Sequence, residues 1–119
     1  MARVVALADD IFFIAKMKET AKQSGVELET VGTSSAFAAA AAADGTSLLI
    51  VDLNAPESLQ AVEKLRAAGN TLPLIAYLSH VQVDLAERAR AAGCTEVLPR
   101  SRFTRELAEI LSRARTIGG

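Results

Sequence analysis

Acidic residues stand at the ends of two apolar runs in this sequence. Asp9 and Asp10 follow residues 4–8, and Asp52 follows residues 48–51. A run of four apolar residues, two of them β-branched, is typical of a strand that is buried on both faces. Asp52 is therefore expected at the rim of a parallel sheet, where open α/β folds hold their ligands. On this segment alone, a simple role in capping the next turn is an equal alternative.

Polar residues also follow two later apolar runs. Ser79 and His80 come after residues 72–78, and Arg100 comes soon after residues 96–98. Because the carboxyl ends of parallel strands share one edge of the sheet, we expect these residues to join the three aspartates there. The repulsion among three nearby carboxylates must be offset by positive charge.

This set of side chains suits the acceptance of a phosphoryl group. Magnesium ion binds carboxylates, main-chain carbonyls and water, and it leaves room for a phosphate oxygen. Arg100 would add a fixed positive charge from another side, and Ser79 would add a small hydroxyl. An aspartate beside a cation, a hydroxyl and a guanidinium is placed to receive a phosphoryl group, whose added charge those groups then meet.

The elements that must position these residues alternate along the chain. Helical patterns separate five apolar runs, so we expect one α/β domain over residues 1–119 with a parallel sheet and right-handed crossovers. Two of the helices end in the same string, Arg-Ala-Ala-Gly, which supports a repeated strand and helix unit. The expected strands cover residues 4–8, 26–31, 48–51, 72–78 and 96–98, and the expected helices cover 11–24, 35–43, 57–68, 81–92 and 104–115.

The second of these helices is nearly all alanine. Its high helix propensity favours a helix, with Thr33 or Ser34 as the N-cap. Phe37 is its one large anchor, and a low-complexity linker is the alternative interpretation. Before it, Glu27 and Glu29 alternate with apolar residues, as in an edge strand whose outward charges discourage further pairing.

Composition excludes several classes of function. The 119 residues are half hydrophobic, which is typical of a compact domain, and the net charge of −1 argues against non-specific nucleic-acid binding. No apolar run approaches the roughly 20 residues of a membrane helix, and the first residues show no signal-peptide pattern. With a single cysteine, Cys94, and a single histidine, a Cys/His metal cluster cannot form within one chain. We expect Cys94 to be a buried thiol and the protein to be cytoplasmic.

These features resemble the receiver domains of two-component response regulators over essentially the whole chain. The resemblance rests on the Asp9-Asp10 pair, on Asp52-Leu53-Asn54-Ala55-Pro56 and on Leu98-Pro99-Arg100. It implies a doubly wound, five-stranded parallel sheet of strand order 2-1-3-4-5 with helices on both faces, as in flavodoxin-like folds.

The resemblance also implies roles for individual residues. Asp52 matches the phosphoacceptor, and Asp10 and Asp52 match direct magnesium ligands. Asp9 matches a ligand that acts through water, and Asn54 one that acts through its main-chain carbonyl. Such a domain is a signalling switch in a phosphorelay and not an enzyme. We find no nucleophile elbow or Ser-His-Asp order that would indicate hydrolysis.

The sequence departs from the family pattern around the switch residues. Ser79 matches the switch hydroxyl, although counting from Pro73 puts that position at Leu78. Arg100 stands where the family has a lysine, and Val97 stands where it has an aromatic residue. The loop after residue 56 lacks the expected Asp-Gly or Asn-Gly turn. A pseudo-receiver, which binds partners without phosphorylation, is therefore the alternative function.

The expected partners follow from the same resemblance. A histidine kinase or phosphotransfer protein would meet the chain near Phe12 and Phe13, of which only one can point fully inward. An output domain or a second receiver is a further possible partner, whereas nucleic acid and membrane are not expected. His80 either narrows phosphate access or, as we favour, caps the next helix. A flavin or nucleotide carrier is disfavoured, because Ala8-Asp9-Asp10 would repel phosphate.

Overall fold

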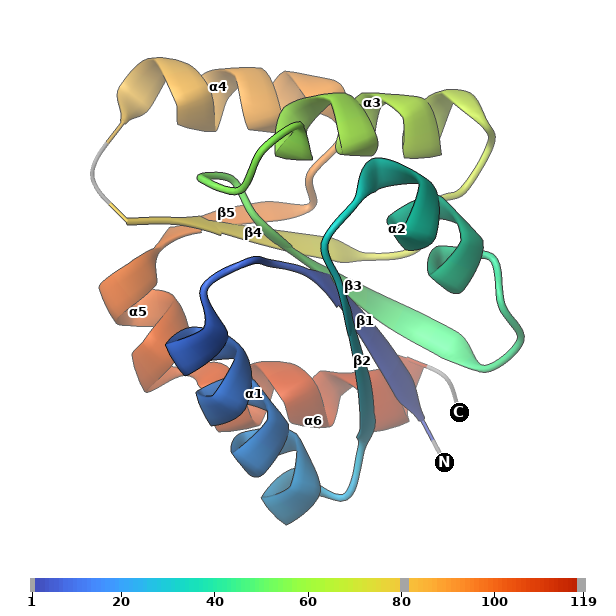
Figure 1. Cartoon of the computed structure of the whole chain (residues 1–119), viewed down its shortest axis with the longest axis vertical. Coiled ribbons are helices and arrows are strands. Elements are labelled where there is room, and N and C mark those ends of the chain that lie inside the picture. Colours follow the sequence, from blue (N-terminus) through green and yellow to red (C-terminus); the bar gives the residue numbers. More distant parts are fainter. Residues whose placement is uncertain (1, 80–81, 118–119) are drawn as a thin grey trace.

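Five parallel strands form a single sheet in the order β2-β1-β3-β4-β5, which confirms the predicted order (Figure 1). The structure is a computed structural model, and it describes residues 2–79 and 82–117. The strands are β1 (Arg3–Leu7), β2 (Glu27–Val31), β3 (Thr46–Asp52), β4 (Leu74–Leu78) and β5 (Glu96–Pro99). The helices are α1 (Ile11–Ser24), α2 (Ser34–Ala41), α3 (Ser58–Ala67), α4 (Val83–Ala92), α5 (Arg100–Arg105) and α6 (Leu107–Ile117).

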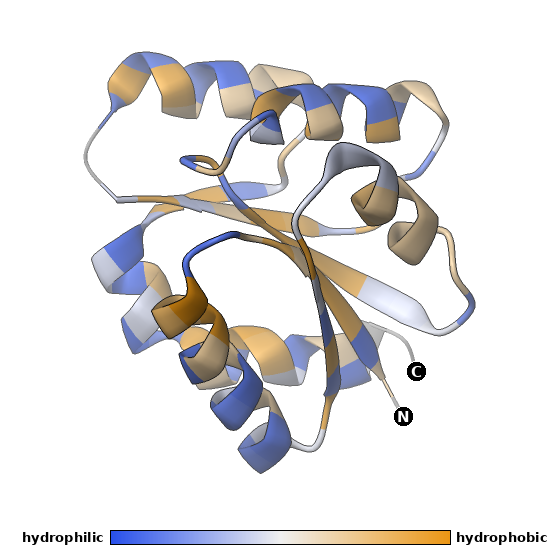
Figure 2. Ribbon diagram, in the orientation of Figure 1, coloured by the Kyte–Doolittle hydropathy of each residue, from blue (hydrophilic) through white to orange (hydrophobic). Residues whose placement is uncertain are grey.

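Helices cover both faces of the sheet. Helices α1, α5 and α6 pack on one face, and α2, α3 and α4 pack on the other (Figure 1). Alternate strand residues point to the two faces, so Ile50 and Tyr77 belong to the first core while Val51 and Leu78 belong to the second. The inner strands are apolar along most of their length, whereas α1, α3, α4 and α6 mix hydrophobic and hydrophilic residues (Figure 2). Among the described residues no helix is long and apolar enough to cross a membrane.

Local signals fix both ends of α1 and the start of α2, where the predicted cap at Thr33 is confirmed. The Asp10 side chain caps α1, and Gly25 ends it in the left-handed conformation at φ 70°. Thr33 caps α2 by accepting a hydrogen bond from the N–H of Ala36. Phe37 is fully buried, so the alanine-rich segment is a packed helix and not a linker.

The closing segment differs from its prediction. Residues 104–115 were expected to form one helix, but helix begins at Arg100, directly after Pro99, and is interrupted at Glu106, where φ is −100° and ψ is 9°. The interruption separates α5, which buries Phe103, from α6, which buries Leu107. The described chain therefore has six helices instead of five. The predicted start of the fourth helix at residue 81 lies outside the described residues.

One arginine connects the loops that precede β4 and β5. Arg66, near the end of α3, donates to the carbonyl oxygens of Gly93 (3.0 Å), Asn70 (3.1 Å) and Leu72 (2.7 Å). Cys94 follows Gly93 and is buried, as expected. Three hydrogen bonds from one planar guanidinium thus hold the turns after α3 and α4 in fixed positions.

Candidate functional site

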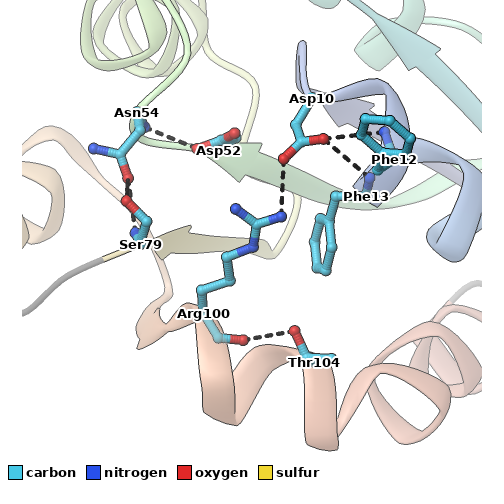
Figure 3. Close-up of polar contacts among 8 residues, drawn as sticks. All are labelled: Asp10, Phe12, Phe13, Asp52, Asn54, Ser79, Arg100 and Thr104. Atoms are coloured by element: carbon cyan, nitrogen blue, oxygen red, sulfur yellow. Dashed lines mark hydrogen bonds and ion pairs between the residues drawn. The ribbon is translucent and has the colours of Figure 1, made fainter.

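The ends of β1, β3 and β5 bring the predicted residues together. Asp9 and Asp10 follow β1, Asp52 ends β3, and Arg100 follows β5 as the first residue of α5 (Figure 3). The charges of Asp9, Asp10 and Arg100 all act on the Asp52 carboxylate, which confirms the expected convergence.

Asp52 is a buried carboxylate, with 7% of its surface exposed. Its Oδ1 accepts a hydrogen bond of 2.9 Å from the N–H of Asn54. Burial raises the pKa of Asp52, and the negative charges of Asp9 and Asp10 add to this effect, which the Asn54 N–H and Arg100 oppose. No salt bridge to Asp52 forms within the described part of the chain, so its charge is only partly compensated.

Asp10 is already engaged on both oxygens. Its Oδ1 accepts from the N–H groups of Phe12 (3.0 Å) and Phe13 (3.2 Å), as an N-cap does. Its Oδ2 accepts from Nη2 of Arg100 at 2.9 Å. The Arg100 hydrogen bond and then the Phe13 N–H hold the pKa of Asp10 below its usual value. Asp10 therefore stays ionised beside its arginine.

The Arg100 guanidinium also lies over an aromatic cluster. Its central carbon is 4.5 Å from the centre of the Phe13 ring. Phe13 contacts Tyr77 and Phe103 with ring centres 5.1 and 5.9 Å apart, and the Tyr77 and Phe103 rings stack at 4.5 Å. The Tyr77 hydroxyl is buried and finds no hydrogen-bond partner among the described residues. The sequence predicted that one phenylalanine of α1 would point inward, but nothing in it indicated that this ring would contact the Arg100 guanidinium.

Ser79 is held by Asn54 on the opposite side of the site from Asp10 (Figure 3). The Asn54 Oδ1 accepts from the main-chain N–H of Ser79 (2.7 Å) and from its hydroxyl (3.0 Å). Asn54 Nδ2 donates to Oε1 of Gln82 at 3.0 Å, a partner that the sequence did not suggest. Leu78, the position that counting from Pro73 gives for the hydroxyl, is buried in the core on the α3 side. The hydroxyl at the end of β4 therefore comes from the next residue, Ser79. His80 lies outside the described residues.

Val97, which stands where receiver domains have an aromatic residue, lines a surface groove. Val97 is half-buried, and with Leu78, Val83 and Ala86 it lines a groove of about 210 Å³ between α4 and β5. The groove also contains Gln82, which contacts Asn54. No aromatic side chain among the described residues lines this groove.

The oxygen donors suit a magnesium ion by their chemistry. Asp9, Asp10 and Asp52 supply carboxylates, and one guanidinium leaves their combined charge negative, which a divalent cation would offset. Within residues 2–79 and 82–117, however, no group of three His, Cys, Asp or Glu side chains is arranged to hold a metal ion. The donor types fit magnesium, and Asp10 Oδ2, which accepts one hydrogen bond from Arg100, is the less occupied of its two oxygens.

Exposed apolar side chains surround this edge of the sheet. Phe12 is 83% exposed, Ile11 is 72% exposed and Val83 is 60% exposed. These three are the only large apolar side chains fully at the surface of the described residues, and they begin α1 and α4 at the same edge as Asp52. Phe13 is buried, which confirms that only one phenylalanine of the pair points inward.

Comparison with known proteins identifies the fold. No family model and no curated protein matches the sequence. A response regulator receiver domain protein from Clostridium thermocellum superposes with a TM-score of 0.80 at 17% identity, over 98% of this chain and 95% of that one. A receiver protein from Pseudoalteromonas atlantica gives 0.83 at 14% identity, over 96% and 97%. NtrX from Brucella abortus gives 0.80 at 17% identity, over 99% of this chain but 27% of that one. The chain therefore has the fold of response regulator receiver domains.

Proposed function

We propose that the chain is a receiver domain of two-component signalling that accepts a phosphoryl group on Asp52. The supporting observation is a desolvated, weakly compensated carboxylate at the sheet edge, with a raised pKa and with Arg100 nearby. In the reaction, an oxygen of Asp52 forms a bond to phosphorus while the bond from phosphorus to the nitrogen of a donor phosphohistidine breaks. The donor ring, which carries a proton on its other nitrogen, leaves as neutral imidazole, and Asp52 becomes an acyl phosphate.

The neighbouring residues have separate tasks in this proposal. Arg100 supplies positive charge to the phosphoryl oxygens, and Ser79 supplies a hydroxyl once it turns from Asn54. Magnesium ion, held by Asp9, Asp10, Asp52 and the main-chain oxygen of Asn54, would supply the charge that offsets the carboxylates.

The phosphoryl donor is a histidine kinase or phosphotransfer protein. Such a donor must place its histidine beside Asp52, and the exposed side chains of Ile11, Phe12 and Val83 offer it apolar contact around that residue. The NtrX match covers a small part of that chain, which is the precedent for an output domain joined to this one.

Beryllofluoride, an analogue of the phosphoryl group, tests the proposal. With magnesium present, it should shift the backbone NMR signals of Asp52, Asn54 and Ser79 in the wild-type chain. The Asp52→Asn variant keeps the shape of the side chain and should show no such shifts. The absence of a response in the wild-type chain would overturn the proposal.

A pseudo-receiver is the second candidate, because several contacts fit it as well. Both Asp10 oxygens accept hydrogen bonds from within the chain, the Ser79 hydroxyl bonds to Asn54, and Val97 stands at the position of the aromatic switch residue. A pseudo-receiver would bind its partner equally well as wild type and as Asp52→Asn, and it would ignore beryllofluoride.

A further inference from the structure

We propose that Asp44 is a site of spontaneous chemical modification, at which the chain isomerises to isoaspartate through a cyclic succinimide. Asp44 lies in the turn between α2 and β3, at the opposite end of β3 from Asp52, so the inference does not depend on the proposed function. The reaction needs only an aspartate whose carboxyl group can be reached by the main-chain nitrogen of the next residue.

The sequence of this turn favours the reaction. Asp44 is followed by Gly45, and this is the only Asp-Gly or Asn-Gly pair in the chain. Glycine has no β-carbon to obstruct the approach of its nitrogen to the preceding side chain, and its backbone rotates more freely than that of any other residue. Asp84 is followed by the bulky Leu85 and lacks this advantage.

The structure leaves both reacting groups free. Asp44 and Gly45 are exposed, and a β-carbon added at Gly45 would meet no other group within 4 Å. Within the part of the chain that the structure describes, the Asp44 carboxylate forms no salt bridge and the Gly45 N–H donates to no main-chain oxygen. The nitrogen that must attack is therefore not held by a hydrogen bond, as most main-chain N–H groups are.

The hydrogen bonds of the turn come from Thr46 and bypass the reacting pair. The N–H of Thr46 donates to the carbonyl oxygen of Ala43 at 3.3 Å, and its hydroxyl donates to that of Ala40 at 3.0 Å. Gly45 already lies in the left-handed region, at φ 89°. Asp44 and Gly45 can therefore rotate locally without any loss of core packing.

The reaction has two steps, and each is balanced. In the first, the Gly45 nitrogen loses its proton and forms a bond to the side-chain carboxyl carbon of Asp44, whose hydroxyl leaves with a proton as water. In the second, water adds to one of the two ring carbonyls, and the bond from that carbon to the ring nitrogen breaks. Opening at the main-chain carbonyl gives isoaspartate, whereas opening at the side-chain carbonyl restores Asp44.

Isoaspartate changes the path of the main chain and leaves its charge unchanged. The Asp44 methylene enters the backbone, so the turn becomes longer directly before β3. Thr46, the first residue of β3, can then no longer keep both hydrogen bonds to Ala40 and Ala43. We expect the isoaspartate form to unfold at a lower urea concentration than the original chain.

Incubation of the whole chain in water that carries a heavy oxygen isotope tests the inference. Each ring opening places one solvent oxygen on residue 44, and mass spectrometry of proteolytic fragments locates it. We expect heavy oxygen at Asp44 in the folded wild-type chain, together with an isoaspartate fragment that separates by chromatography. Asp84 is also exposed, and as the control within the same molecule it should take up none.

Two variants check that ring closure is the cause. Asp44→Glu has a longer side chain that would have to form a larger ring, which closes more slowly, so the uptake of heavy oxygen should be lost. Asp44→Asn loses ammonia in place of water, which is the faster reaction at neutral pH. It should give isoaspartate sooner than the wild-type chain does.

Each opposite result overturns the inference. Uptake at Asp44 in the urea-unfolded chain but not in the folded chain would mean that the turn holds Asp44 out of reach of the Gly45 nitrogen. Equal uptake at Asp44 and Asp84, or uptake that persists in Asp44→Glu, would exclude ring closure as the route, and so would the absence of any uptake. None of these results bears on the proposed function, which beryllofluoride tests separately.

Discussion

Asp52 carries a charge that burial opposes, and the fold therefore stores a cost at this residue. We expect Asp52→Asn to raise the free energy of unfolding by about 1 kcal/mol at neutral pH, because the amide keeps the contact with the Asn54 N–H without the charge. Urea unfolding of both proteins measures the difference. A less stable Asp52→Asn variant would contradict this account of the site.

The difference between these two proteins should depend on pH in a definite direction. The folded-state pKa of Asp52 lies above 3.8, the ordinary value of an aspartate, so the native state takes up this proton before the unfolded state does as the pH falls. The stability gain of Asp52→Asn is full above the folded-state pKa, shrinks between that pKa and 3.8, and vanishes below.

At the scale of elements, the turn from β3 into α3 holds a strained residue. Glu57 precedes α3 at φ 61° and ψ 15°, and it is the one non-glycine residue with positive φ among those described. Side chains disfavour this left-handed conformation, so Glu57→Gly should stabilise the protein by about 1 kcal/mol in urea unfolding.

The same substitution inside α3 provides the matched control. Glu63 is exposed on α3, where the backbone is right-handed, so Glu63→Gly should destabilise the protein by about 1 kcal/mol. If both variants lose stability, the left-handed turn is not strained. The missing Asp-Gly or Asn-Gly signal in this loop thus corresponds to a left-handed residue that the chain fills with glutamate.

At the scale of the whole molecule, the sequence pattern predicts the strands and most helices, whereas the hydrogen-bond partners of the site residues depend on tertiary packing. The apolar runs predicted the strands, and the capping residues predicted helix starts. The strand order followed from the resemblance to receiver domains. This order places Asp10, Asp52 and Arg100 at one edge of the sheet. The sequence could not show that Arg100 would choose Asp10 over Asp52, because that choice depends on the position of the first turn of α1. The apolar spacing also predicts helix only from Thr104 onward and therefore misses the first turn of α5, which begins at Arg100.

Cys94, the only cysteine, follows Gly93, whose carbonyl oxygen accepts a hydrogen bond from Arg66. The reactivity of this thiol can therefore report how often the turn between α4 and β5 opens. Burial raises the pKa of Cys94 to about 11, so an alkylating reagent at neutral pH should modify it only when the turn between α4 and β5 opens. Arg66→Met removes the three carbonyl contacts that hold this turn, and we expect it to speed alkylation about tenfold. Labelling that stays unchanged would mean that the guanidinium does not restrain the turn. Mass spectrometry on the native chain measures the alkylation rate. A change in this rate when a ligand binds near Asp52 would show that the two opposite ends of the sheet are coupled.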